Sequence, residues 1–238
     1  MLKEIYDQPE TAKNWLKNYL IKNSENGQYQ INYSFDTKFF ESIERIEIIA
    51  CGTSKHAAMV GKFLLEQFSG IPTNVFYASE FRYSPPPLLP NTLTIGVTQS
   101  GETADTIAAI DMEIKRRSSK EDKKFTPNLI AITNRKESSI GRQVLNIIDI
   151  CAGIEVGVAA TKTFFGQLLS FYGLAIKFAQ IKGTQSSDEV DKLITELIKL
   201  PPLIEDLLEQ HNESSEKLAH DFFNIKDVIF LGRGINYP

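Results

Sequence analysis

The chain has 238 residues, of which 42% are hydrophobic and 24% are charged, and its formal net charge is −4. This length suits one large α/β domain with appendages, and the composition is ordinary for a globular protein. Basic and acidic residues are interspersed, so no basic patch points to nucleic acid as a partner.

The termini, cysteines and histidines exclude further classes. No apolar run approaches the ~18 residues of a membrane span, and the N-terminal residues lack the apolar core of a signal peptide. Cys51 and Cys151 form no redox or metal motif, and His56, His211 and His220 lack the spacing of metal ligands. We therefore expect a cytoplasmic protein with reduced thiols, without a cofactor, a metal or a membrane partner.

The chain opens with a polar-faced helix over residues 1–20 and a loop over 21–36. Five short apolar segments then predict buried strands, at 46–50, 74–78, 92–97, 128–133 and 147–150. Helical patterns occur between or after them, at 55–69, 103–117, 138–145 and 159–181. Strands alternating with helices predict an α/β three-layer sandwich with a five-stranded parallel sheet, flavodoxin-like in type.

The C-terminal part changes in composition. From Ser187 it is charged and helical, with Pro201-Pro202 ending one helix and starting the next. Asp227 to Gly234 then resembles the strand and glycine turn at residues 46–52, so we expect the first strand of a second, similar domain there. The predicted organisation is an N-terminal helical lead (1–36), the α/β domain (37–184), a helical linker (185–226) and that strand (227–238).

The segment from Thr98 to Thr106 carries the strongest functional signal. Hydroxyl side chains stand at positions 98, 100, 103 and 106, between an apolar strand and a helix. Backbone N–H groups at a helix N-terminus, together with hydroxyl donors, can hold a phosphate without a metal or a lysine. This loop predicts a phosphorylated small molecule as the ligand. Glu102 should point away from such a phosphate.

A second loop, Cys51-Gly52-Thr53-Ser54, also follows a strand and precedes a helix. If the two strands are neighbours, both loops converge on one pocket at the carboxyl edge of the sheet. Ordinary capped turns would explain the same residues, because Ser and Thr favour helix N-caps. Lys162 is similarly open to two interpretations, an anion contact or a tight loop-to-helix junction.

Four segments together resemble a known family. They are Ala-Cys-Gly-Thr-Ser at 50–54, Ala-Ser-Glu-Phe-Arg-Tyr at 78–83, Gln-Ser-Gly-Glu-Thr-Ala-Asp-Thr at 99–106 and Glu-Val-Gly-Val-Ala-Ala-Thr-Lys at 155–162. In this order they resemble the glutamine–fructose-6-phosphate aminotransferase (isomerising) family, or glucosamine-6-phosphate synthases. The resemblance is to the first of two sugar isomerase (SIS) domains and covers nearly the whole chain.

The resemblance implies a site for a sugar phosphate, fructose 6-phosphate or glucosamine 6-phosphate. The implied phosphate-binding residues are Thr98, Gln99, Ser100 and Thr103, and the implied sugar-binding residues are Cys51, Gly52, Thr53, Ser54, Val158 and Ala160. Positions 98 and 160 are often Ser in the family. Thr98 keeps the hydroxyl, whereas Ala160 removes one hydrogen bond.

The resemblance also implies which parts of the family's machinery lie elsewhere. The glutaminase domain does not match residues 1–238, and the second SIS domain matches only at its start. The family's catalytic glutamate, histidine and lysine lie beyond that start and match no residue here. We therefore expect no catalytic residue in this chain, binding without turnover, and a homodimer to which helix 159–181 contributes. The alternatives are a non-catalytic SIS module that senses sugar phosphates, and a subunit that works only with a partner chain.

Overall fold

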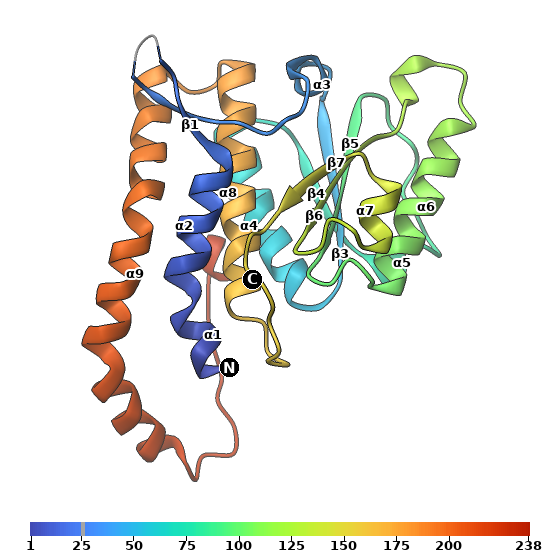
Figure 1. Cartoon of the computed structure of the whole chain (residues 1–238). Coiled ribbons are helices and arrows are strands. Elements are labelled where there is room, and N and C mark those ends of the chain that lie inside the picture. The colour runs from blue at the N-terminus through green and yellow to red at the C-terminus, as the bar shows by residue number, and fades with distance from the viewer. Residues whose placement is uncertain (25–26) are drawn as a thin grey trace.

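The computed structural model describes residues 1–24 and 27–238. At its centre lies a five-stranded parallel sheet with the order β4-β3-β5-β6-β7 (Figure 1). The strands are β3 (Arg45–Ala50), β4 (Thr73–Tyr77), β5 (Thr92–Thr98), β6 (Asn128–Thr133) and β7 (Asn146–Asp149). Each predicted strand is present with both of its ends within one residue of the prediction, and the predicted three-layer fold is confirmed.

Helices cover both faces of the sheet because successive strand residues point to opposite sides. Ile46, Ile48 and Ala50 of β3 pack into the core with α4 (Gly52–Ser69) and α8 (Lys162–Lys182). Ile49 points to the other face, where the sheet is covered by α5 (Ala78–Phe81), α6 (Ala104–Ser118) and α7 (Ser139–Gln143). The predicted helix starts at residues 55 and 159 move to Gly52 and Lys162.

The N-terminal lead and the C-terminal helix form an outer layer against α8 (Figure 1). The lead contains α1 (Leu2–Tyr6) and α2 (Gln8–Tyr19), and α9 (Ser187–Phe222) packs against α2. Trp15 of α2 is fully buried, and its indole N–H donates to Ser170 Oγ on α8 at 3.3 Å. As expected from its apolar sequence, α8 is therefore buried, with the sheet and α4 on one side and this outer layer on the other.

The expectation of a plain loop over residues 21–36 is wrong. Strands β1 (Leu20–Lys22) and β2 (Tyr29–Ile31) pair antiparallel there, and the predicted loop residues 25–26 lie outside the described part. Ile31 and Tyr33 are buried against the core, so tertiary burial orders a segment whose polar composition favours a loop. A short helix, α3 (Thr37–Glu41), leads into β3.

Pro201 and Pro202 do not divide the C-terminal helical region into two helices. Both lie inside α9, although a proline removes one backbone donor from the helix. The buried residues Val190, Ile194, Leu197 and Pro201 follow one another at helical spacing along one stripe. Packing of this stripe against α2 and α8 explains why the helix continues through the prolines.

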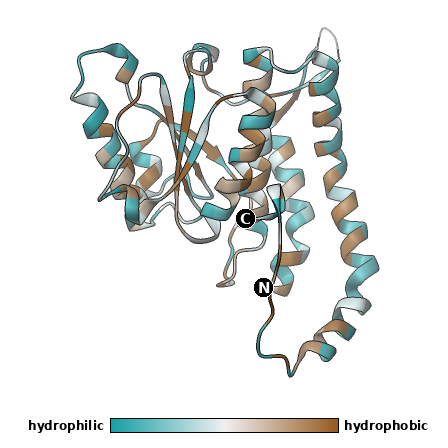
Figure 2. Ribbon diagram, turned by 180° about the vertical axis from the view of Figure 1, so that it is seen from behind, coloured by the Kyte–Doolittle hydropathy of each residue, from teal (hydrophilic) through white to brown (hydrophobic). Residues whose placement is uncertain are grey.

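Residues 227–231 form no strand in this structure, and the expectation that 227–238 hold the first strand of a second domain stays a prediction. Among the described residues this segment has no strand partner, and it runs extended outside the helices, with hydrophobic colouring, in Figure 2. Ile229, Phe230 and Leu231 are 84%, 91% and 93% exposed. A strand requires a neighbour to accept its backbone hydrogen bonds. A short turn, η2 (Gly234–Asn236), follows and contacts α4.

Within residues 1–24 and 27–238, no helix is both long and apolar enough to cross a bilayer.

Glu47 is a charged residue at the centre of the sheet. It is only 4% exposed on β3, and burial together with the nearby Glu113 carboxylate raises the pKa of Glu47 to about 7. The folded protein therefore holds more protons than the unfolded chain between the ordinary pKa of 4.5 and about 7. By linkage, stability falls as the pH rises through this window.

We predict that Glu47→Gln stabilises the protein at pH 8, by up to about 3 kcal/mol. At this pH the buried Glu47 is ionised at a cost in free energy, whereas glutamine is uncharged at every pH. At pH 4.5 the variant and the wild type should differ little. Urea unfolding at both pH values measures the difference, and Glu41→Gln on the exposed end of α3 is the matched control. An equal shift at both pH values would contradict the prediction.

Candidate functional site

The two predicted loops lie side by side at the carboxyl edge of the sheet. Strands β3 and β5 are neighbours, and Ala50 at the end of β3 is in register with Val97 near the end of β5. The chain passes from β3 to β4 on one side and then returns to β5 on the other. This reversal is the switch point at which open α/β sheets bind ligands.

The four residues expected to hold a phosphate form one tight turn. The Thr98 and Thr103 hydroxyl oxygens are 2.7 Å apart, and the Gly101 N–H donates to Thr98 Oγ1 at 3.3 Å. Ser100 Oγ accepts from the Glu102 N–H at 3.1 Å, and Asn134 on the neighbouring strand end donates to the Gln99 carbonyl. The turn therefore has a fixed shape directly before α6.

This arrangement leaves hydrogen-bond donors for a ligand. A pair of hydroxyls that share one hydrogen bond has one hydroxyl hydrogen left over, and a hydroxyl that accepts can still donate. The turn thus offers donors from the Thr98–Thr103 pair and from Ser100. Thr98 is buried, whereas Gln99, Ser100 and Thr103 are half-buried, so the donors stand at the border between core and solvent.

Glu102 points away from this turn, as expected. Its carboxylate accepts from the Ser139 N–H at 2.8 Å, at the first residue of α7. Hydrogen bonds from Ser139, with Arg142 and Arg135 nearby, hold the pKa of Glu102 below its ordinary range. The negative charge is therefore engaged at a helix N-terminus, where it is favourable, and does not repel an anion in the turn.

The loop after β3 is joined to α8. Cys51 is half-buried, Gly52 begins α4 with φ of 54°, and Thr53 is exposed. Gln167 on α8 donates from Nε2 to Ser54 Oγ at 2.9 Å. The Ser54 hydroxyl can still donate its own hydrogen. This contact fixes the first turn of α4 relative to α8.

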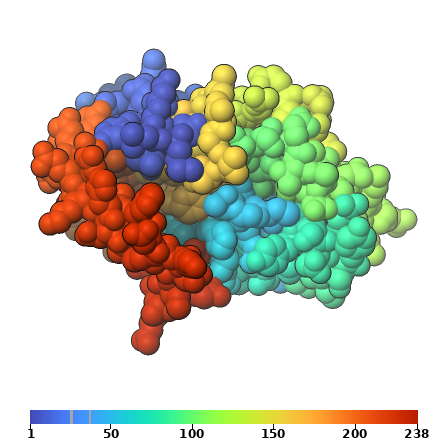
Figure 3. Space-filling view, turned by 90° about the horizontal axis from the view of Figure 1, so that it is seen from below, coloured from blue at the N-terminus to red at the C-terminus, as the bar shows by residue number. Residues whose placement is uncertain are grey.

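The loop over residues 151–161 connects β7 to α8, and α8 packs against α4. Seen from below, the yellow loop adjoins the light blue and green segments that follow β3 and β5 (Figure 3). Ala160 is half-buried, and Val158 is fully exposed, at 104%. Their contact with a sugar stays a prediction.

A family model for the SIS domain matches residues 39–177. This match covers more than half of the chain, and it includes both hydroxyl-bearing loops. The chain belongs to the SIS domain family.

Relatives of this SIS domain are similar over the whole chain. Proteins named glutamine–fructose-6-phosphate aminotransferase (isomerising) from Thermosynechococcus vestitus and Synechocystis are 51% and 49% identical over 100% of the chain. The chain spans 38% of the length of each. The C-terminal domain of glucosamine-fructose-6-phosphate aminotransferase from Francisella tularensis matches with a TM-score of 0.88 and 31% identity. That match covers 99% of this chain and 62% of the solved one.

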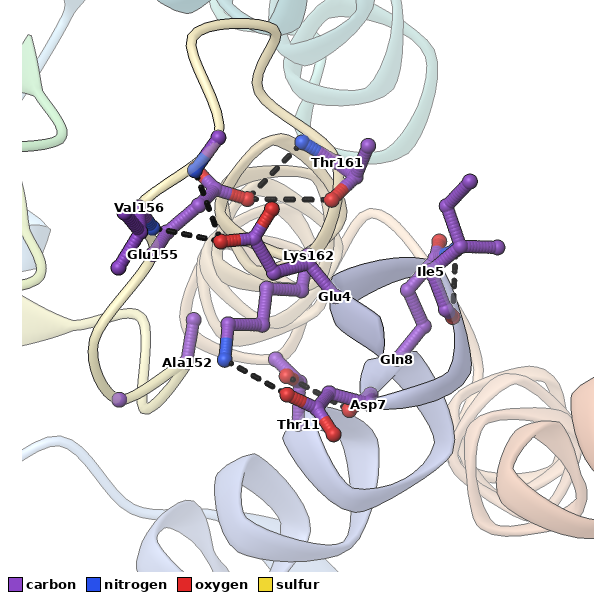
Figure 4. A network of polar contacts seen from close by, with 12 residues as sticks. Glu4, Ile5, Asp7, Gln8, Thr11, Ala152, Glu155, Val156, Thr161 and Lys162 are labelled. Carbon is purple, nitrogen blue, oxygen red and sulfur yellow. Dashed lines mark hydrogen bonds and ion pairs between the residues drawn. The ribbon is translucent and has the colours of Figure 1, made fainter. Parts of the chain in front are cut away.

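Lys162 of the SIS domain belongs to a loop-to-helix junction. Its side chain is 8% exposed, and its Nζ lies 3.0 Å from Asp7 Oδ2 in the N-terminal lead (Figure 4). The interpretation of Lys162 as an anion ligand is therefore not favoured. Glu155 accepts from the Thr161 and Thr163 N–H groups and thereby holds the first turn of α8.

Two residues of the lead, Glu4 and Asp7, were not expected at the site. Asp7 pairs with Lys162, and Glu4 accepts from the backbone of the 151–161 loop (Figure 4). Sequence separations of about 150 residues hide such contacts from a local pattern. In the sequence, these contacts are indicated only by the charged residues of Lys3-Glu4-Ile5-Tyr6-Asp7, which precede an amphipathic helix.

The 98–103 turn requires a glycine at position 101 for two reasons. Its φ is 70°, in the left-handed region that favours glycine. A Cβ at this position would also lie 2.3 Å from Ser138 Cβ, well inside contact distance.

We predict that Gly101→Ala lowers the free energy of unfolding by about 2–4 kcal/mol, from backbone strain plus overlap. Gly153→Ala is the matched control, because Gly153 has a φ of 64° and open space among the described residues. The control should lose only about 1–2 kcal/mol. Equal losses in urea unfolding would show that the contact with Ser138 is unimportant.

Proposed function

We propose that this SIS domain binds a sugar phosphate, fructose 6-phosphate or glucosamine 6-phosphate. In this proposal it is the phosphate-binding half of the isomerase module of a glutamine–fructose-6-phosphate aminotransferase, in amino-sugar synthesis. The observation that carries the proposal is the hydroxyl-rich turn 98–103 at the switch point between β3 and β5. The names of the relatives support the choice of substrate.

The turn suits a phosphate dianion for electrostatic reasons. Ser100 and the Thr98–Thr103 pair supply hydroxyl donors, and α6 begins directly after Thr103. The N-terminus of a 15-residue helix carries partial positive charge on its free N–H groups. Hydrogen bonds to a charged acceptor are stronger than those between neutral groups. A lysine or a metal ion is not required in this arrangement.

The sugar would extend from the phosphate toward the loop after β3. The proposed contacts there are Cys51, Gly52, Thr53 and Ser54, with Val158 and Ala160 from the 151–161 loop. Gly52 has room for a ligand, since a Cβ built on it meets no described atom within 4 Å. The two loops follow β3 and β7. In the sheet, β3 is next to β5 on one side, and β7 lies two strands away on the other side, so the loops would approach the sugar from two sides.

The chemical steps belong, in this proposal, to residues outside this chain. The whole activity converts fructose 6-phosphate and glutamine to glucosamine 6-phosphate and glutamate. General acid–base and Schiff-base groups for that isomerisation must reach the sugar within hydrogen-bond or bonding distance. The proposal assigns no such group to residues 1–238, and a homodimer stays a prediction.

Calorimetric titration tests the proposal directly. We expect the chain to bind fructose 6-phosphate and glucosamine 6-phosphate, with unphosphorylated fructose giving no signal at the same concentration. Equal binding of fructose would contradict a phosphate-directed site. Absence of binding by a folded chain would contradict the proposal that this half of the module forms the site by itself.

The phosphate turn can be tested by mutation. We predict that Ser100→Ala combined with Thr103→Ala weakens fructose 6-phosphate binding by about 1–3 kcal/mol, because two donors to a charged group are lost. Ser118→Ala, an exposed change at the opposite end of α6, is the control and should leave the affinity unchanged. An unchanged dissociation constant for the double variant would contradict the assignment of the turn.

A further inference from the structure

Glu4 is buried although it lies in the short first helix of the chain. Its exposure is 7%, and its Oε1 accepts from the Val156 N–H at 2.5 Å and the Gly157 N–H at 2.8 Å (Figure 4). Hydrogen bonds from the Gly157 and Val156 N–H groups, together with the Met1 ammonium 3.1 Å from Oε2, lower the pKa of Glu4 to about 2, so the carboxylate is ionised at neutral pH. A carboxylate that accepts from two successive N–H groups fixes both peptide planes.

Gly157 is matched to this contact. A Cβ on Gly157 would lie 2.4 Å from Glu4 Oε2, so a larger residue would push the carboxylate away. The φ of Gly157 is outside the positive range that requires glycine. The close approach of Glu4, rather than the backbone conformation, therefore explains why this position has no side chain.

The loop is held at its other end as well. Glu155 accepts from the Thr161 N–H at 2.9 Å, and Lys162 pairs with Asp7, the residue between α1 and α2. The stretch between these attachments contains Val158, which is fully exposed. The lead thus anchors both flanks of the segment proposed to contact the sugar.

We infer that Glu4 is a positioning residue for the sugar site. It holds the backbone at 156–157, and this places Val158 and Ala160 where the sugar would lie. The inference rests on the proposed function, in which the 151–161 loop contacts the sugar part of the ligand and the 98–103 turn contacts its phosphate. By thermodynamic reciprocity, a bound sugar phosphate then stabilises the Glu4 contact and the docking of α1.

Two measurements on the full chain separate this role from a general structural one. The first is amide hydrogen exchange at Val156 and Gly157 without ligand, and the second is affinity for fructose 6-phosphate compared with inorganic phosphate. Glu4→Ala should speed exchange at both amides by about tenfold and weaken fructose 6-phosphate binding several-fold. Inorganic phosphate should bind as in the wild type, because it contacts only the 98–103 turn.

Further variants make the test specific. Glu4→Gln retains an oxygen acceptor without the charge, so its effects should lie between wild type and Glu4→Ala. Gly157→Ala breaks the same contact from the loop side, and combining it with Glu4→Ala should add little. Glu10→Ala, an exposed glutamate in α2, is the control and should change neither measurement.

Unchanged exchange at Val156 and Gly157 in Glu4→Ala would overturn the anchoring role. Faster exchange with unchanged fructose 6-phosphate affinity would overturn the positioning role, as would equal weakening for inorganic phosphate. If the wild-type chain binds neither ligand, the proposed function fails together with the positioning of a sugar. In that case the exchange measurement still decides whether Glu4 orders the loop.

Discussion

The parallel pairing of β3 with β5 is the constraint on which the site depends. Their register, with Ala50 opposite Val97, brings the loops at 51–54 and 98–103 to the same edge of the sheet. The return of the chain from β4 across β3 creates the switch point, and both loops lead into helices whose N-termini face this edge. If β3 and β5 were separated by another strand, the two loops would be about 10 Å apart, since strands lie ~4.8 Å from each other.

The packing of α8 then adds a third segment to this edge. Gly61 on α4 allows close approach, because a Cβ there would lie 2.4 Å from a ring carbon of Phe171 on α8. Gln167 donates to Ser54 across the same interface, so the first turn of α4 is joined to α8. The 151–161 loop must consequently return from β7, at the edge of the sheet, to a helix that lies beside α4. The course of this loop follows from the order of the strands and helices.

Three glutamates organise the loops around the site in the same way. Glu102 accepts from the N-terminus of α7, Glu155 from the N-terminus of α8, and Glu4 from the loop backbone at 156–157. Each carboxylate satisfies backbone N–H groups that a loop would otherwise leave to water. Each carboxylate is engaged by these donors, and Glu102 in this way points away from the 98–103 turn. These contacts give the loops a fixed arrangement, so the proposed ligand would require little further ordering of them.

The sequence by itself determined the fold class, the order and approximate bounds of the five strands, and the two hydroxyl-rich loops, because alternation of apolar segments and Gly-Ser-Thr turns are local signals. It also indicated that Glu102 would avoid a phosphate. Only the tertiary structure decided that Lys162 pairs with Asp7, that α9 continues through Pro201, and that Glu4 holds the 151–161 loop. These contacts join residues about 150 positions apart or depend on burial against a second helix. The physical reason is that charge pairing and packing are set by distance in space, and a local pattern contains no information about which distant segment will lie beside it.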